Sequence, residues 1–136
     1  MDETSTNVWE SKFKIWQPKN TVLPMVYSLP KKRGSNVTII GAISNRQNKI
    51  YYNIINNTST LKVLEFFRYL KKNMILKDKI IVMDNHPAHH SKLVTDFIYR
   101  HGGILLFMPP ISSYFNPIET IWSWVKSKWR NKLIDL

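Results

Sequence analysis

Cysteine is absent from the 136 residues of this chain. Its absence excludes disulfide bonds, thiolate zinc sites and cysteine nucleophiles, and it fits a reducing compartment. The chain also lacks any uninterrupted run of eighteen or more apolar residues, so no membrane contact is expected. Its first residues, MDETSTNVWE, are acidic and polar where a signal peptide would be basic and then apolar. We therefore expect a soluble intracellular protein.

Acidic residues are scarce, since nine Asp and Glu stand against twenty Lys and Arg, for a formal net charge of +11. This excess makes a polyanion the leading candidate partner. Three stretches mix cations with aromatic residues, which suits a phosphate backbone and unstacked bases: 12–16, 66–72 and 122–132. For any one stretch, the alternative is a set of basic residues on the solvated face of a helix whose aromatics lie in the core. The excess over the whole chain favours nucleic acid.

Residues 1–136 are expected to form one domain, because 43% of them are hydrophobic and neither a repeat nor a low-complexity linker interrupts them. Residues 9–36 contain three prolines and several basic residues, which predicts an irregular basic loop. Two β-branched stretches at 37–44 and 48–55, joined by the polar turn NRQN, predict an antiparallel hairpin. Capping hydroxyls and helical spacing of apolar residues then predict a helix over 58–73.

The second half of the chain alternates between short apolar runs and amphipathic segments. Residues 79–84 and 104–110 are typical of strands buried on both faces. Residues 92–103 predict a helix that ends at a glycine pair. A final helix is predicted from Asn116 to about residue 132, with a proline in its first turn. The order of elements therefore indicates a mixed α/β fold.

Candidate chemistry follows the strand at 79–84. Asp84 ends this strand and Asn85 follows, at the sheet edge where functional groups gather in open α/β sheets. The alternative is a carboxylate that only caps the next helix. Three imidazoles at 86, 89 and 90 are spaced for a shared zinc ion, although no cysteine or well-spaced fourth ligand supports that alternative. Glu119, taken alone, is explained as an acidic residue in the first turn of a helix.

Three stretches together resemble the catalytic motifs of Tc/mariner-type transposases, members of the DDE superfamily that also includes bacterial insertion-sequence relatives. VMDNHPAHHS resembles the motif around the second aspartate, with four matches: Asp84, Asn85, His89 and Ser91. MPPISSYFNPIETIW resembles the third motif, with seven matches: Pro109, Pro110, Asn116, Pro117, Ile118, Glu119 and Trp122. MDETS resembles the first motif, with Asp2 as the first aspartate and Glu3 as its usual neighbour. Residues 85–118, 34 in all, lie between Asp84 and Glu119, the spacing of the D-D-E branch.

The resemblance implies an RNase H-like fold, with three antiparallel strands, a helix, and then alternating strands and helices. It places the first aspartate at the end of a first strand that is largely missing here. Family members also carry a helix-turn-helix DNA-binding region before this strand, and we expect that region to be absent here. We expect a decayed copy or a gene model started at an internal Met, with a domesticated or partner-dependent fragment as the alternative.

The resemblance also implies cut-and-paste transposition, in which DNA is cleaved and strands are transferred with the help of two Mg²⁺ or Mn²⁺ ions. Three carboxylates would be catalytic and would bind the metal: Asp2, Asp84 and Glu119. Three further residues would support the ligands or orient the substrate: Asn85, His89 and Asn116. The partners would be transposon ends and target DNA, contacted by six basic residues: Lys31, Lys32, Arg33, Lys126, Lys128 and Arg130.

Several alternatives stay open at this point. The chain would act in a nucleus if eukaryotic and in the cytoplasm or nucleoid if bacterial, and a homodimer is compatible with the family. An inactive nucleic-acid-binding remnant of a transposase is the main competing function. A structural zinc or scaffold protein is the third.

Overall fold

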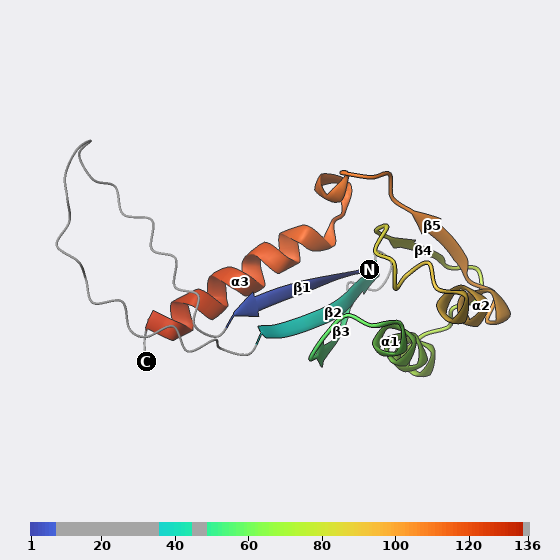
Figure 1. The fold of residues 1–136 in the computed structure, drawn as a ribbon, viewed down its shortest axis with the longest axis horizontal. Coiled ribbons are helices and arrows are strands. Elements are labelled where there is room, and N and C mark those ends of the chain that lie inside the picture. The colour runs from blue at the N-terminus through green and yellow to red at the C-terminus, as the bar shows by residue number, and fades with distance from the viewer. Residues whose placement is uncertain (8–35, 45–48, 135–136) are drawn as a thin grey trace.

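The computed structural model describes residues 1–7, 36–44 and 49–134 (Figure 1). The elements run in the order β1 (Asp2–Asn7), β2 (Asn36–Ser44), β3 (Lys49–Ile55), α1 (Thr60–Asn73), β4 (Ile80–Met83), α2 (Lys92–Arg100), β5 (Ile104–Phe107), a 3₁₀ turn (Ser113–Phe115) and α3 (Ile118–Ile134). The predicted turn at 45–48 and nearly all of the predicted basic loop, 9–35, lie outside the described residues. None of the described helices is long and apolar enough to cross a membrane.

The first three strands form one antiparallel sheet in the order β1-β2-β3. Strand β2 is central, with Gly41 opposite Asp2 on one side and opposite Tyr52 on the other. β-branched residues and tyrosines favour strands because they pack well on a pleated surface. The predicted hairpin and the three antiparallel strands are therefore confirmed.

Strand β1 differs in position from the expectation, because Asp2 begins it rather than ends it. Its sequence, DETSTN, has no apolar residue from which a strand could be inferred. The strand is held instead by backbone pairing with β2 and by hydroxyl groups, such as Ser5 Oγ, which lies 2.8 Å from Thr38 Oγ1. Thr4 and Thr38 are buried, so the β-branched threonines fill places that apolar residues would otherwise take.

Helix α1 begins at the N-cap Ser59, whose side chain accepts a hydrogen bond from the Lys62 amide. Its apolar residues recur at helical spacing and form the centre of the core. The buried residues of this helix are Val63, Leu64, Phe66, Phe67 and Leu70. The predicted helix is thus confirmed, with a start two residues later than expected, within the usual uncertainty of a helix boundary.

Strands β4 and β5 form a separate, parallel, two-stranded sheet. The face that carries Met83 packs into the core against the helices. The other face is exposed and apolar, with 64% of Ile80 and 54% of Ile104 accessible to solvent. The prediction that these strands are buried on both faces was therefore wrong, since an apolar run does not tell which of its faces is covered.

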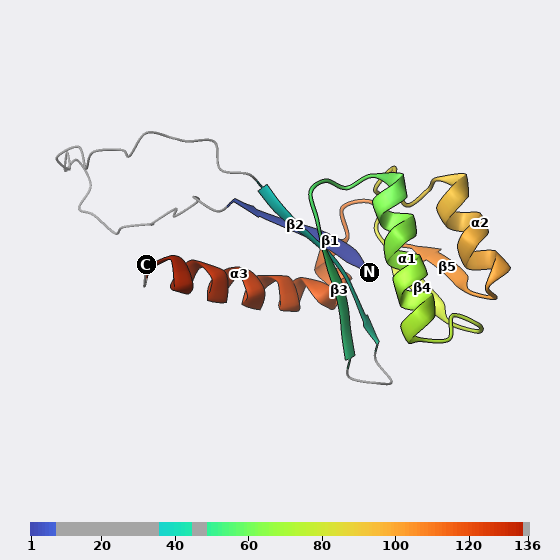
Figure 2. The ribbon, with the colours of Figure 1, turned by 90° about the horizontal axis from the view of Figure 1, so that it is seen from below.

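The helices lie on both sides of the strands. Figure 2 shows α1 and α3 on opposite sides of the three-stranded sheet, with α2 beside α1. Helix α3 is anchored at its beginning by the buried residues Ile118 and Trp122, whereas Trp124 near its middle is exposed. The N-terminus lies between the two sheets (Figure 1). The fold is mixed α/β, as predicted.

Candidate active site

The two sheets meet where β1 begins and β4 ends. The backbone nitrogen of Met1 donates a hydrogen bond to Val82 O over 2.8 Å, which joins the start of β1 to β4. Asp2 is the next residue of β1, and Asp84 directly follows β4. The backbone therefore brings two of the predicted catalytic aspartates to the same seam.

Asp2 lies among several negative charges. Its side chain is buried, and its Oδ1 accepts a hydrogen bond from the Glu3 amide over 2.8 Å. Burial raises the pKa of Asp2 to about 6, with the charges of Asp84, Glu119 and Glu3 adding to the effect and the Glu3 hydrogen bond opposing it. Asp2 therefore lies within electrostatic range of three other carboxylates.

Glu119 lies in the first turn of α3, and its charge acts on Asp2. Its amide donates to Asn116 O over 3.1 Å, so the buried Asn116 helps to define where the helix begins. One turn later, Trp122 lies over Gly41, the residue that pairs with Asp2 across the sheet. Residues three apart share a helix face, so this packing sets Glu119 near Asp2.

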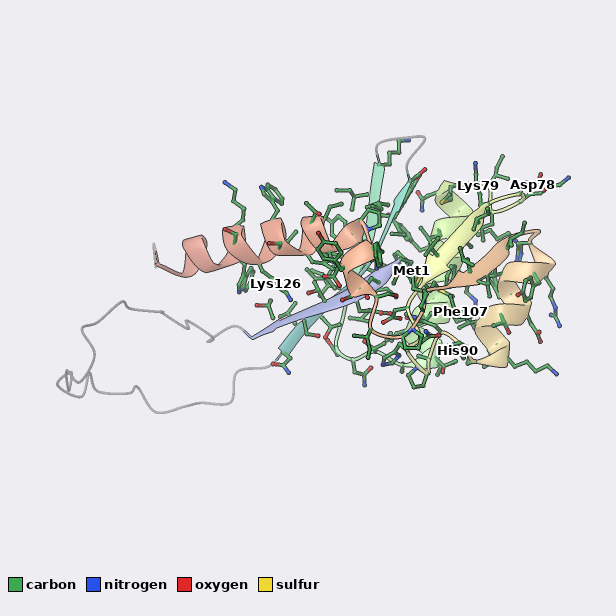
Figure 3. All side chains as sticks on the ribbon, turned by 90° about the horizontal axis from the view of Figure 1, so that it is seen from above. Met1, Asp78, Lys79, His90, Phe107 and Lys126 are labelled. Atoms are coloured by element: carbon green, nitrogen blue, oxygen red, sulfur yellow. The ribbon has the colours of Figure 1, made fainter. Side chains whose placement is uncertain are left out.

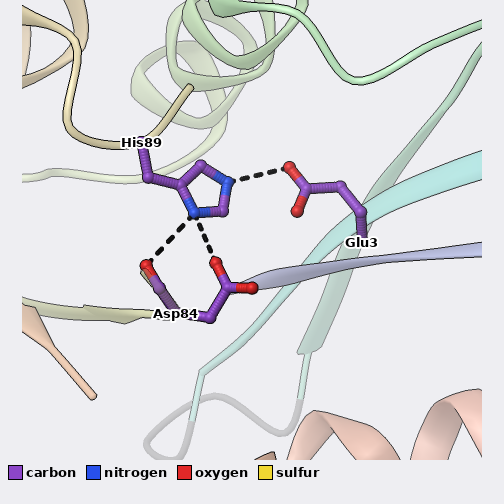
Figure 4. A group of neighbouring side chains, drawn as sticks. All are labelled: Glu3, Asp84 and His89. Atoms are coloured by element: carbon purple, nitrogen blue, oxygen red, sulfur yellow. Dashed lines mark hydrogen bonds and ion pairs between the residues drawn. The ribbon is translucent and has the colours of Figure 1, made fainter. Parts of the chain in front are cut away.

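A fully buried histidine joins two of the acids (Figure 4). His89 Nε2 lies 2.9 Å from Glu3 Oε1, and His89 Nδ1 lies 2.7 Å from Asp84 Oδ1. Burial lowers the pKa of His89, but the hydrogen bond and charge of Glu3 and the charge of Asp84 outweigh it, so the net pKa is raised. The ring is therefore favoured in its cationic form between two carboxylates.

The other polar residues of the second motif hold the loop after β4. Asn85 Nδ2 donates to Met108 O, and Asn85 Oδ1 lies 3.0 Å from His90 Nε2. The ring of His90 stacks on Phe107 with 4.0 Å between centroids (Figure 3). These contacts connect the end of β4 to the end of β5. Whether Asn85 also orients a substrate stays a prediction.

The contacts of the histidines do not support a zinc site shared by His86, His89 and His90. His86 Nδ1 accepts from the Ala88 amide, and both ring nitrogens of His89 face carboxylates. Within the described residues, the ligand-type atoms found within 4.8 Å of one another belong instead to Glu3, Asp84 and His89. A ring that hydrogen-bonds on both sides offers no lone pair to a metal, so this group is better described as an ion-pair cluster.

The carboxylates at the seam fit a divalent cation better than the histidines do. Asp2, Asp84 and Glu119 offer oxygen ligands, which Mg²⁺ and Mn²⁺ prefer. Burial raises the pKa of Asp2, the nearby carboxylates add to this shift, and a bound cation would oppose it by favouring the ionised carboxylate. In Figure 4 the Asp84 oxygen that does not contact His89 points toward β1.

Comparison with known proteins identifies the family. The sequence model of the DDE superfamily endonucleases matches residues 1–135. The chain belongs to this family. No curated protein sequence matches it at a significant level. Family membership implies the use of a divalent metal ion, while the identity and number of the ions stay predictions.

Two solved structures share the fold of this DDE superfamily chain. One is described as "Mos1 transposase paired-end complex with left transposon end", with 15% sequence identity and a TM-score of 0.56 over 94% of this chain and 46% of that chain. The other is "Crystal structure of the Mos1 Strand Transfer Complex", with 16% identity and a TM-score of 0.52 over 77% of this chain and 32% of that chain. The chain thus spans less than half the length of the Mos1 chains. The predicted RNase H-like fold is confirmed.

The predicted DNA-binding residues fall largely outside the described side chains. Lys31, Lys32 and Arg33 lie in the undescribed segment 8–35, and the side chain of Arg130 is not described either. Lys126 is half-buried on α3, where Figure 3 labels it, and Lys128 is exposed. Their contact with DNA stays a prediction for this DDE superfamily chain.

Two residues of the site were not predicted from the sequence. Glu3 was recognised only as the usual neighbour of the first aspartate, whereas the structure links it to His89. Gly41 lies in a strand that reads as continuously β-branched and apolar, and a glycine inside such a strand is itself a signal of close backbone approach. That signal would have identified Gly41 as a packing position.

Proposed function

We propose that this chain is the catalytic domain of a Tc/mariner-type transposase, which cleaves DNA and transfers the cut strand with two divalent metal ions. The observation that carries the proposal is the hydrogen bond from Met1 N to Val82 O, which joins the start of β1, where Asp2 lies, to the strand that Asp84 follows. The charges of Asp84 and Glu119 add to burial in raising the pKa of Asp2. These residues belong to β1, to the position after β4 and to α3, so the proposal requires the fold to bring together residues far apart in the sequence.

Each carboxylate has a task in this proposal. Asp2 and Asp84 would hold the ions at the seam between the sheets, and Glu119 would be a further ligand of the second ion. Two bound divalent ions supply activation of the attacking oxygen and stabilisation of the leaving oxygen in a displacement at phosphorus. Asp2 must be ionised for this role. Because its pKa is raised to about 6, Asp2 loses its proton only as the pH rises through that value, and a bound cation would favour the ionised form. No covalent bond from the protein to DNA is required.

The DNA partner is supported by charge and by the similar structures. The formal net charge of +11 suits a phosphate backbone, and the Mos1 structures are described as complexes of transposon ends and of strand transfer. By analogy, the substrate of this chain would be the end of a mobile element, followed by a target duplex. A homodimer is proposed on the same analogy, and light scattering on the purified chain tests it.

Nicking of supercoiled plasmid in the presence of Mn²⁺ tests the proposed reaction. We expect Asp84→Asn and Glu119→Gln each to lower the rate about 100-fold or more, because each removes a charged oxygen ligand. Glu65→Gln is the matched control, since Glu65 is an exposed acid in a surface ion pair with Lys62. Equal loss in all three variants, or none in the first two, would contradict the assignment.

An inactive nucleic-acid-binding remnant is the second candidate. It is favoured by the formal net charge of +11. DNA binding that survives Glu119→Gln, together with no nicking by the unaltered chain, would select this candidate. Metal-dependent nicking by the unaltered chain would exclude it.

A further inference from the structure

We infer that Glu3 is a positioning residue: through His89 it fixes the orientation of Asp84 and holds β1 against the end of β4. The inference rests on the proposed function in one respect, namely that Asp84 binds a metal ion. Glu3 itself would touch neither the ion nor the DNA.

The buried imidazole is held on both sides. His89 is fully buried, and its Nε2 and Nδ1 lie 2.9 Å from Glu3 Oε1 and 2.7 Å from Asp84 Oδ1. Rotation of the ring would break both contacts at once, and burial leaves no water to replace them. The distance and direction between Glu3 and Asp84 are therefore fixed by the ring that separates them.

Asp84 is oriented as a consequence. Its Oδ1 faces His89 and also accepts from the His86 amide over 3.2 Å. With this oxygen occupied, the second oxygen points toward β1 in Figure 4. A carboxylate free to rotate would spend much of its time in other directions. The chain from Glu3 through His89 thus prepares one oxygen of Asp84 for a ligand.

The same contact crosses the boundary between the two sheets. Glu3 belongs to the three-stranded sheet, while Asp84 and His89 follow β4 of the two-stranded sheet. Backbone pairing does not continue across this boundary in the described residues, apart from the hydrogen bond between Met1 and Val82. Successive residues of a strand face opposite sides, so anchoring Glu3 on one side also sets the position of Asp2 on the other.

The geometry argues against direct metal binding by Glu3. Its Oε1 is occupied by His89, and the imidazole ring lies between it and Asp84 (Figure 4). Carboxylates placed behind a metal site in this way usually orient the ligands, and their loss lowers metal affinity about 10- to 100-fold. We expect an effect of that size when Glu3 is replaced.

Mn²⁺ affinity of the 136-residue chain, measured by electron paramagnetic resonance of the free ion, tests the inference. We expect Glu3→Ala to weaken binding about 10- to 100-fold. Glu3→Gln should lose less, because its amide oxygen can still accept from His89 Nε2 and so preserves the orientation of the ring. This second variant also keeps the test valid if Glu3→Ala does not fold.

Ser5→Ala is the matched control. Ser5 is two residues from Glu3, on the same side of β1, and its hydroxyl bonds Thr38 away from the carboxylates. This variant should bind Mn²⁺ as the unaltered chain does. Unchanged affinity in Glu3→Ala, or an equal loss in Ser5→Ala, would overturn the inference.

A metal-free measurement separates the inference from the proposed function. In spectra recorded without metal, the side-chain carboxyl ¹³C signal of Asp84 should shift in Glu3→Ala and should stay unchanged in Ser5→Ala. The His89 Nε2 proton should be visible far downfield in the unaltered chain and in Glu3→Gln, and it should be lost in Glu3→Ala. If the unaltered chain bound no Mn²⁺, the proposed function would fail, and these signals alone would decide whether Glu3 orients Asp84.

Discussion

Trp122 packs so closely over Gly41 that its Cη2 atom lies 2.6 Å from the place a Cβ atom of residue 41 would take. Gly41 pairs with Asp2 in the sheet, and Trp122 is one helical turn from Glu119. The missing side chain at residue 41 therefore allows α3 to approach the strands and brings Glu119 toward the first aspartate. The packing of an apolar ring on a glycine thus helps to assemble the proposed site.

Gly41→Ala should push Trp122 away from the sheet. Real Cβ atoms do not approach other heavy atoms to this distance, so α3 or the ring must move. We expect the free energy of unfolding to fall by about 1–3 kcal/mol, as for an overpacked core. Urea denaturation measures the stability, and the rate of plasmid nicking should fall by more than a change in stability alone explains.

A double variant shows whether Trp122 is the cause. Trp122→Phe removes the outer ring that carries Cη2, so the added methyl group should then fit. We expect Gly41→Ala to cost clearly less stability in the Trp122→Phe background than in the unaltered chain. Equal costs in both backgrounds would show that the strain lies elsewhere in the sheet.

The raised pKa of Asp2 predicts a pH-dependent stability in the absence of metal. The folded state holds a proton up to a pKa of about 6, whereas the unfolded chain releases it near 3.8. The unfolded state binds fewer protons between these values, so the free energy of unfolding falls as the pH rises through this window and levels off above it. A pKa shift of this size changes the free energy of unfolding by about 3 kcal/mol.

Asp2→Asn isolates this effect, because an amide does not titrate. The difference in unfolding free energy between the two chains, measured in urea from pH 4 to pH 7 with chelator, should change across the Asp2 window. Protonation of His89 also stabilises the folded state. Because the pKa of His89 is raised, this stabilisation is lost only at higher pH, and it is present in both chains. A difference that does not vary with pH would refute the assignment of the shift to Asp2.

Much of the fold follows from local patterns. Helix α1 has an N-cap serine and apolar residues at helical spacing, and the β2–β3 hairpin has β-branched residues beside a polar turn. In both elements, local preference and tertiary packing agree, which is when sequence patterns succeed. Asp84 and Glu119 were predicted as site residues from motifs, and the structure has Asp84 directly after β4 and Glu119 in the first turn of α3, as those motifs indicate.

Other features depend on contacts between distant residues and leave no local pattern. Strand β1 is polar along its length and is stabilised by pairing with β2, so hydrophobic periodicity could not reveal it. The link between Glu3 and His89 joins residues 86 positions apart. The exposed faces of β4 and β5 were misjudged because an apolar run does not tell which side is covered.

Asn85→Asp should loosen the loop that carries Asp84. Asn85 donates through Nδ2 to Met108 O, and a carboxylate would place an oxygen against that carbonyl. Loss of the bond and the new repulsion should lower stability by about 1–3 kcal/mol above the pKa of the new acid. Thermal unfolding at neutral pH measures this change, and Asn73→Asp, which loses a similar but exposed bond to Tyr69 O, is the control. Equal losses of stability in the two variants would show that the hydrogen bond to Met108 O stabilises the chain no more than the exposed hydrogen bond to Tyr69 O does.

Lys128→Gln tests whether α3 contacts DNA. Lys128 is exposed on the helix that begins with Glu119, so a duplex bound at the carboxylates would pass along it. If Lys128 neutralises one phosphate, its loss should reduce the slope of log affinity against log salt by about 0.9. Lys77→Gln is the matched control, since Lys77 is exposed between α1 and β4, at the end of β4 away from Asp84. Fluorescence anisotropy of a labelled duplex at several salt concentrations measures both slopes. A slope that changes for Lys77→Gln and not for Lys128→Gln would place the DNA at the other end of the strands, away from the proposed metal ligands.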